Sequence, residues 1–174
     1  MQTEAQTLVH PLKPVWSRDS QILILGSFPS VLSRKSAFYY GNPQNRFWKV
    51  LAEVFHAPLP ENNEGKRALL IANGIALWDV IASCRICGSA DSSIADVVPN
   101  DLSGLLSQAP IRRILLNGKT AERLFYRYNS GLSIPVIALP STSPANAAWN
   151  LERLCKAWGA ALHESISCGF FHFF

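Results

Sequence analysis

The stretch from residue 22 to residue 48, ILILGSFPSVLSRKSAFYYGNPQNRFW, places the strongest constraint on how this chain can fold. Its first four residues, Ile22 to Leu25, are all aliphatic, which is typical of a parallel strand that is buried on both faces. Gly26 and Pro29 end that strand, and NRFW at positions 45–48 begins a helix. A polar and aromatic loop therefore follows a buried strand directly, at the sheet edge where open α/β folds bind their ligands.

That loop carries the chemical groups that are needed to hold a nucleic acid. Ser27, Ser30 and Ser33 supply hydroxyl groups, and Arg34 lies next to a second basic residue. Three adjacent aromatic residues follow at positions 38–40. Hydroxyl and basic groups bind phosphate, whereas aromatic rings stack on flat bases, so the loop indicates a nucleotide site.

Buried strands alternate with amphipathic helices along the rest of the chain. We expect strands at 22–25, 75–81, 111–116 and 134–139, and helices at 45–56, 64–73, 101–108, 119–128 and 146–160. This alternation predicts an α/β fold, a three-layer α/β/α sandwich around a central four-stranded, mostly parallel sheet. The 174 residues suit a single domain.

Three segments fall outside this alternation. Residues 1–20 are expected to be an entry segment, and residues 83–96 are expected to be a polar loop. Asn100 and Asp101 are expected to cap the helix that follows them. The tail at 165–174 is apolar without a helical or strand period, so the sequence leaves its structure open.

The composition is compatible with a nucleic-acid-binding protein but does not require one. The net charge of +4 is only mildly basic, and many proteins of similar charge bind no anion. No run approaches the ~18 apolar residues of a membrane span, and the N-terminus lacks the layout of a signal peptide. We therefore expect a cytoplasmic protein that does not enter a membrane, and we expect it to be a monomer.

Neither the cysteines nor the glycines indicate a bound cofactor. Cys84 and Cys87 have the spacing of a metal or redox pair, but two reduced, half-buried thiols are the simpler interpretation. No histidine pairs with a cysteine at zinc spacing. ILLNGK at 114–119 lacks the first glycine of a P-loop, and no GxGxxG follows a strand. We expect neither a metal nor a cofactor.

Two motifs together resemble those of a known family. GSFPS at 26–30, with FYYGNPQNRFW at 38–48, resembles the first motif of the uracil-DNA glycosylase superfamily. LPSTSPAN at 139–146 resembles the second motif, the serine-proline loop after the last strand. The resemblance covers roughly residues 20–160. It is strongest to the hypoxanthine-DNA (deoxyinosine) glycosylases, and the mismatch-specific uracil/thymine-DNA glycosylases come next.

The resemblance implies a DNA repair enzyme that hydrolyses the N-glycosidic bond of deaminated bases in DNA. Hypoxanthine is the favoured substrate, and uracil is the alternative. Such an enzyme flips the nucleotide out of the duplex, stacks the base and stabilises the departing anion, none of which requires a metal. Two other interpretations remain open: a non-catalytic nucleic-acid- or nucleotide-binding module with the same cleft, and a hydrolase of nucleosides or small molecules.

Asn45 and Ser141 are the candidate catalytic residues. The asparagine of the NRFW-type motif is the important polar group in the branch that this chain resembles. A carboxamide can donate to a base, accept from it or orient a water molecule. Asn45 could instead cap the helix that begins after it. Ser141 stands where relatives place a histidine or an asparagine that bonds the departing base or the sugar side.

Gly26, Ser27, Phe28 and Tyr40 are the candidates for binding the base. A turn after a strand brings backbone N–H groups and hydroxyls close to a ligand. Phe28 stands where uracil glycosylases carry a water-activating aspartate, so another group must perform that step. Tyr40 stands where mismatch-specific relatives stack an aromatic ring on the base, although either of the two aromatic residues before it could be that platform.

Residues that would contact the DNA outside the base come from both motifs: Ser30, Ser33, Arg34, Thr142, Ser143 and Asn146. Asn146 is also a candidate cap for the last helix. Ala145 stands where relatives insert a wedge into the vacated stack, and alanine is a poor wedge. Four polar residues between the motifs could touch the base, order the loops or be surface caps: Asp79, Asp91, Asn100 and Asp101.

Overall fold

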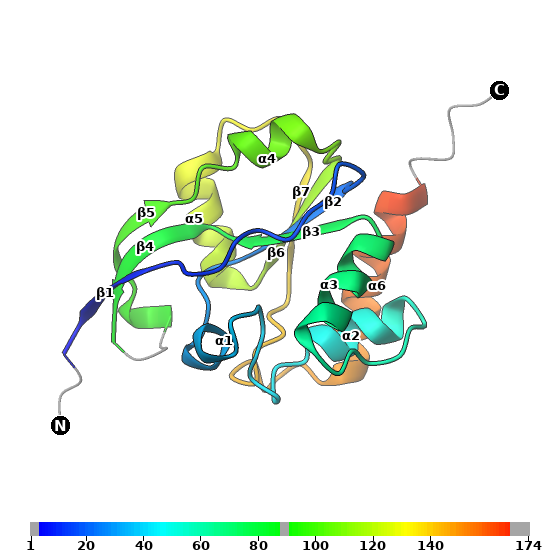
Figure 1. Ribbon diagram of the computed structural model, residues 1–174, viewed down its shortest axis with the longest axis horizontal. Helices are drawn as coiled ribbons and strands as arrows, with labels where there is room; N and C mark the ends of the chain where they lie inside the picture. Colours follow the sequence, from blue (N-terminus) through cyan, green and yellow to red (C-terminus); the bar gives the residue numbers. More distant parts are fainter. Residues whose placement is uncertain (1–3, 88–90, 168–174) are drawn as a thin grey trace.

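The central sheet has four parallel strands in the computed structural model, which describes residues 4–87 and 91–167 (Figure 1). In sheet order the strands are β3 (Ile75–Asp79), β2 (Ile22–Gly26), β6 (Arg113–Asn117) and β7 (Val136–Leu139). Every neighbouring pair is parallel, and all five residues of β2 are buried. The buried inner strand and the four-stranded parallel sheet are therefore confirmed.

Helices cover both faces of this sheet, because alternate side chains of β2 point to opposite sides. Ile22 and Ile24 belong to one hydrophobic cluster, and Leu23 and Leu25 belong to another. Three helices pack on the first cluster: α2 (Phe47–Val54), α3 (Asn63–Ala72) and α6 (Leu151–Ser167). Two helices pack on the second cluster: α4 (Ser103–Gln108) and α5 (Lys119–Asn129). Figure 1 shows the two groups of helices on either side of the strands. The three-layer α/β/α sandwich is confirmed.

A second, antiparallel sheet corrects two expectations. Its strands are β1 (Gln6–Val9), β4 (Ile81–Ile86) and β5 (Ala95–Pro99), in the order β1-β4-β5. Residues 1–20 are therefore more than an entry segment, and residues 83–96 are not simply a polar loop. Only Val80 separates β3 from β4, so two strands look like one apolar run. Register shifts between β4 and β5 also break the alternation that would reveal a strand.

A short helix, α1 (Val31–Ser36), interrupts the loop after β2, which the sequence predicts to be irregular. Ser30 starts this helix, because its Oγ accepts a hydrogen bond from the backbone N–H of Ser33. Ala37 ends it in the left-handed region, with φ of 56°. A helix of six residues is too short to show a clear period, so its polar composition indicates a loop instead.

Most helix ends lie within two residues of the predicted bounds, but the last helix begins at Leu151 and not at residue 146. Asn150 caps it, since its Oδ1 accepts a hydrogen bond from the N–H of Arg153. The expected cap at Asn146 is therefore wrong. Residues 165–167 of the predicted tail belong to this helix, and residues 168–174 lie outside the described residues.

Of the two caps predicted before α4, only Asp101 contacts the start of the helix. The carboxylate of Asp101 accepts a hydrogen bond from the backbone N–H of Ser103, at the start of the helix. Asn100 is not a cap, because its side chain donates to the carbonyl groups of Asp79 and Ile81, between β3 and β4. Among the residues that the structure describes, no helix has the length and apolar character required to cross a membrane.

Trp158 of α6 ties that helix to the loop after β7. Its side chain is fully buried, and its Nε1 donates a hydrogen bond to the carbonyl oxygen of Pro140. We expect Trp158→Ala to lower the free energy of unfolding by about 3–5 kcal/mol, because it leaves a large cavity. Urea denaturation measures this. Leu59→Ala, at a half-exposed side chain, is the control, with an expected change below about 0.5 kcal/mol. Equal losses in both variants would contradict the packing described.

Candidate active site

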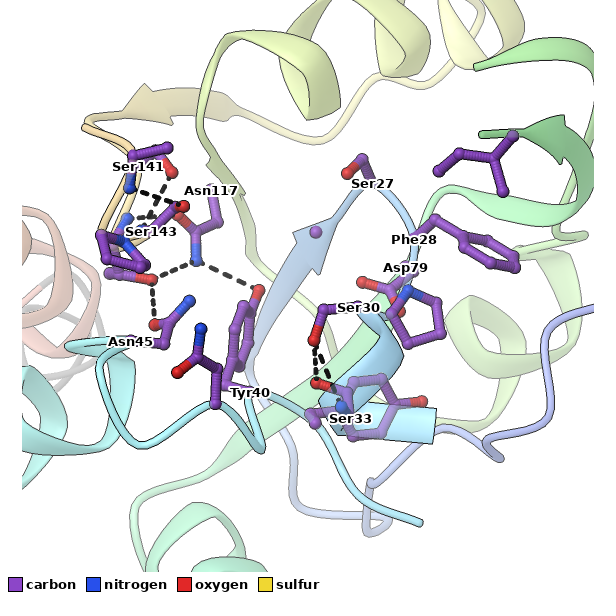
Figure 2. A pocket seen from close by; sticks show the side chains of 18 residues that line it. Ser27, Phe28, Ser30, Ser33, Tyr40, Asn45, Asp79, Asn117, Ser141 and Ser143 are labelled. Carbon is purple, nitrogen blue, oxygen red and sulfur yellow. Dashed lines mark hydrogen bonds between the residues drawn. The ribbon is translucent and has the colours of Figure 1, made fainter. Parts of the chain in front are cut away.

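A pocket of about 410 Å³ opens where the parallel strands end. Gly26 at the end of β2, Asp79 at the end of β3 and Asn117 at the end of β6 all line it, together with the loop that follows β7. This volume lies within the range of small-molecule sites. The predicted position of the site, at the carboxyl edge of the parallel sheet, therefore agrees with a real cavity (Figure 2).

The structure brings most of the predicted site residues together around this pocket. Those that line it are Gly26, Ser27, Phe28, Ser30, Ser33, Tyr40, Asn45, Ser141, Thr142 and Ser143. Arg34 and Asn146 do not line it. Asn117 was not among the candidates, although it has a recognisable signal: it is a polar residue at the end of β6, directly after three buried aliphatic residues.

Asn117 and Thr142 form the centre of a hydrogen-bond network on one wall of the pocket. The backbone N–H of Thr142 donates to Oδ1 of Asn117, which fixes the orientation of this amide. Nδ2 of Asn117 then donates to the hydroxyl oxygens of Tyr40 and Thr142, at 3.1 and 3.0 Å. Thr142 is fully buried. Its hydroxyl acts inside the protein, so its predicted contact with phosphate has no support in this geometry.

Asn45 uses its oxygen for structure and directs its nitrogen to the pocket. Oδ1 accepts hydrogen bonds from the backbone N–H of Phe47 and the hydroxyl of Thr142, both at 2.9 Å. Because a backbone N–H can only donate, the atom facing it must be the oxygen. Nδ2 has no partner among the described residues, and Figure 2 shows it facing the cavity. Asn45 therefore supports the start of α2 and also offers a hydrogen-bond donor to a ligand.

Tyr40 forms an aromatic wall of the pocket. Its ring stacks on the buried ring of Phe47, with centroids 4.1 Å apart and planes inclined by 25°. Gly26 allows this wall to lie close to Asp79, because an added Cβ would fall 2.5 Å from Oδ1 of Asp79 and 2.8 Å from the Tyr40 hydroxyl. A side chain at position 26 would therefore fill the space between them.

Asp79 lies on the opposite side of the pocket (Figure 2) and forms a buried pair with His10. Oδ2 of Asp79 lies 2.7 Å from Nε2 of His10, and both side chains are at most 5% exposed. The backbone N–H of Leu12 donates to Nδ1 of His10, so Nδ1 carries no proton and Nε2 donates to the carboxylate. Burial, followed by the charge of Asp79, raises the pKa of Tyr39 far above its ordinary value.

The serines and the arginine of the first motif have partners inside the protein. Ser33 is buried, and its Oγ accepts from the backbone N–H of Gly41 and lies 3.0 Å from Oγ of Ser30. Arg34 donates to the carbonyl oxygen of Pro29 and lies over the ring of Phe28, 5.7 Å from its centroid. These contacts hold the shape of the first motif around the pocket, and the predicted DNA contacts of the three polar residues stay predictions.

Arg46 holds the serine-proline loop against the first motif. Its guanidinium donates to the carbonyl oxygens of four residues, at positions 142, 143, 146 and 149. The side chain of Asn146 closes the same loop by donating to the carbonyl oxygen of Ser141. The sequence gives no signal for this arrangement, because the two segments lie about a hundred positions apart and a basic residue at the start of a helix usually faces solvent.

The described residues contain no group of three or more histidine, cysteine, aspartate or glutamate side chains placed to hold a metal ion. Cys84, the first member of the Cys-x-x-Cys pair, is 1% exposed. Burial raises the pKa of its thiol, which keeps it protonated and unreactive.

Replacing Arg46 should loosen the serine-proline loop. Arg46→Lys keeps the charge but loses the planar fork that reaches several carbonyl groups, so we expect unfolding to become easier by about 2–3 kcal/mol. We also expect faster amide hydrogen exchange across residues 141–150. Arg85→Lys is the control, since Arg85 is more than half exposed and pairs with Asp96 between β4 and β5, outside this loop. Unchanged exchange in Arg46→Lys would show that the loop holds its shape without this residue.

Comparisons with known proteins agree with this architecture. Residues 14–162 match the sequence profile of the uracil DNA glycosylase superfamily. A hypoxanthine DNA glycosylase from Methanosarcina acetivorans is 38% identical to this chain, and the match covers 80% of this chain and 89% of the relative. A hypoxanthine DNA glycosylase from Methanosarcina barkeri is 37% identical, and that match covers 61% of this chain and 68% of the relative. A solution NMR structure from Methanosarcina acetivorans, named provisionally as a uracil DNA glycosylase, superposes with a TM-score of 0.78 at 34% identity, covering 89% of this chain and 96% of that one. The fold, the two motifs and these matches together show that the chain belongs to the uracil DNA glycosylase superfamily.

Proposed function

We propose that this protein is a DNA glycosylase that hydrolyses the bond between hypoxanthine and deoxyribose in DNA, with uracil as a second substrate. The names of the two Methanosarcina relatives support hypoxanthine as the principal base. The observation that carries the proposal is the amide nitrogen of Asn45, a fixed donor that has no partner among the described residues and lies in a pocket that Tyr40 also lines.

The proposed reaction follows from the positions of Tyr40, Phe47 and Asn45 around the pocket. The flipped base stacks on the side of the Tyr40 ring that lines the pocket, while Phe47 supports the opposite side. When the C1′–N bond breaks, the base leaves with the bonding electrons and becomes negatively charged, while C1′ of the sugar becomes cationic. A water molecule then forms the new bond to C1′ and gives up a proton, which neutralises the released base. Nδ2 of Asn45 donates a hydrogen bond to that departing base and lowers the barrier. Both acceptor positions of its oxygen are occupied, so Asn45 acts as a donor and does not position the water.

The pocket favours hydrolysis over an amine-based mechanism that also cuts the strand. None of the residues that line it in the described part of the chain is a lysine, the usual nucleophile for a Schiff base. The expected enzyme is therefore monofunctional and leaves an abasic site. Ser27, Ser30, Ser141 and Ser143 line the same pocket and are the proposed contacts to the sugar and phosphates near the flipped nucleotide.

The direct test is a cleavage panel with oligonucleotides that carry deoxyinosine, deoxyuridine, xanthine or a G:T mismatch, followed by alkali to cut abasic sites. We expect release of hypoxanthine, with slower release of uracil, and the same rates in excess EDTA. Tight binding to all of these oligonucleotides without release of any base would replace the proposal with a non-catalytic binding module. Activity on free deoxyinosine alone would indicate a nucleoside hydrolase.

Asn45→Asp separates the donor from the structural role of the same side chain. Aspartate keeps an oxygen for the N–H of Phe47 and the hydroxyl of Thr142, but it replaces the donor nitrogen with an acceptor. We expect single-turnover release of hypoxanthine to fall by about 10²–10³, the typical cost of one lost transition-state donor. The midpoint of thermal unfolding should change by only a few degrees.

Asn62→Asp is the matched control, because Asn62 accepts from the N–H of Gly65 at the start of α3 in the same way, outside the residues that line the pocket. We expect this variant to excise at the normal rate. Near-normal excision by a folded Asn45→Asp protein would limit Asn45 to its structural role.

A further inference from the structure

The segment before α2 contains a four-residue β-turn, NPQN at 42–45, with an asparagine at each end. The backbone N–H of Asn45 donates to the carbonyl oxygen of Asn42 at 2.9 Å, which closes the turn. Pro43 stands at the second position, where its fixed φ favours this geometry, and asparagine is a preferred first residue. The Cα atoms of the two asparagines are therefore held within about 7 Å of each other.

Asn42 offers the pocket a hydrogen-bond donor in the same way as Asn45. Asn42 lines the pocket, and its Oδ1 accepts from the backbone N–H of Gln44 at 2.9 Å. The atom that faces a backbone N–H must be the oxygen, so the orientation of this amide is fixed. Nδ2 of Asn42 has no partner among the described residues. The turn therefore carries two amide donors that belong to one pocket, and only that of Asn45 has a role in the proposed reaction.

Contacts with α1 hold the turn from its other side. The backbone N–H of Gly41 donates to Oγ of Ser33 at 3.0 Å. A Cβ added at Gly41 would collide with Oγ of Ser36 and would lie 3.1 Å from the carbonyl oxygen of Leu32, so the residue before the turn must be glycine. A turn that is fixed in this way presents its donors without a further loss of conformational freedom when a ligand binds.

Two neighbouring donors fit a purine that carries an oxygen at C6. Hypoxanthine has two adjacent acceptors on one edge, N7 and O6, which is the pair that guanine presents to proteins in the major groove. Adenine carries an NH₂ group in place of O6, so one of the two donors would face another donor. Uracil has O4 but no ring nitrogen beside it. The other ring acceptor of hypoxanthine, N3, has no second acceptor next to it.

We infer that Nδ2 of Asn42 donates a hydrogen bond to N7 of hypoxanthine while Nδ2 of Asn45 donates to O6, so that the turn binds this edge of the base. This inference rests on the proposed function and adds a residue that sets its preference for a purine. The contact also acts in the reaction, because part of the negative charge on the departing base spreads to N7, where a donor stabilises it. Uracil lacks N7, which gives a physical reason for its slower release.

The test removes the acceptor at N7 and the donor of Asn42, separately and together. Duplexes carry 2′-fluoro-2′-deoxyinosine or its 7-deaza analogue, in which a C–H group replaces N7, and the fluorine slows release of either base. Fluorescence anisotropy measures their affinities. We expect the wild type to bind the 7-deaza duplex about five-fold or more weakly, which is typical of one lost hydrogen bond. Asn42→Asp keeps an oxygen for the N–H of Gln44 but opposes N7 with an acceptor. In this variant we expect the preference to vanish or reverse.

Asn42→Ser removes the same donor without adding a charge. A serine hydroxyl can still accept from the N–H of Gln44, but the shorter side chain withdraws the donor from the pocket. We expect this variant to lose the preference for N7 and to bind normally to a duplex with a tetrahydrofuran abasic site, which has no base. Asn62→Asp is the control, because Asn62 accepts from the N–H of Gly65 outside the residues that line the pocket, and it should keep the wild-type preference.

The outcomes separate this inference from the function on which it rests. If the wild type releases no hypoxanthine from ordinary deoxyinosine, the proposed function fails. If the wild type is active but binds the two fluorinated duplexes within about two-fold of each other, or if both Asn42 variants keep the full wild-type preference, the proposed function stands and the role of Asn42 is overturned. Weaker binding of Asn42→Ser to the abasic duplex would overturn it as well, because it would assign the amide to the DNA backbone.

Discussion

The hydrogen bond between the hydroxyl of Thr142 and Oδ1 of Asn45 is the contact on which the pocket depends. It joins the first motif to the serine-proline loop, 97 positions further along the chain. Asn117 fixes the Thr142 side of this bond, and the N–H of Phe47 fixes the Asn45 side. Because these hydrogen bonds hold the oxygen of Asn45, its amide nitrogen faces the pocket.

Packing and electrostatics support this arrangement from outside the pocket. Arg46 draws four carbonyl groups of the serine-proline loop toward the start of α2. Phe47 lies behind the Tyr40 ring and is itself fully buried in the helical layer. On the other side, the His10–Asp79 pair joins the small antiparallel sheet region to the end of β3. Preorganisation of this kind lets donors and acceptors act on a base without moving during the reaction.

The sequence predicts the parts of the fold that depend on local patterns. The aliphatic run of β2, the alternation of strands with helices and the two polar loops locate the sheet, its layers and most of the pocket. Asn45 shows the limit of such patterns, because helix support and ligand binding are alternatives in the sequence, whereas in the structure the oxygen supports the helix and the nitrogen faces the pocket. Its two polar atoms take one role each.

The features that the sequence did not reveal depend on contacts between distant positions. His10 and Asp79 are 69 positions apart, and neither lies in a pattern that points to the other. β4 and β5 pair with shifted register, so their exposed and buried residues do not alternate. In the sequence, Arg46 resembles an ordinary surface cation, and its role appears only in the structure, where it donates to carbonyl groups of the loop at 142–149. Local propensity carries no information on such pairs, which form only when the whole chain is packed.

The most direct measurement is a crystal structure of the protein with DNA that carries 2′-fluoro-2′-deoxyinosine, whose fluorine slows breakage of the C1′–N bond. We expect hypoxanthine to be flipped into the pocket and stacked on Tyr40. Nδ2 of Asn45 should lie about 2.7–3.2 Å from an acceptor atom of the base. A base that stays in the duplex, or that enters the pocket beyond hydrogen-bond distance of Nδ2 of Asn45, would show that Asn45 does not bind the base.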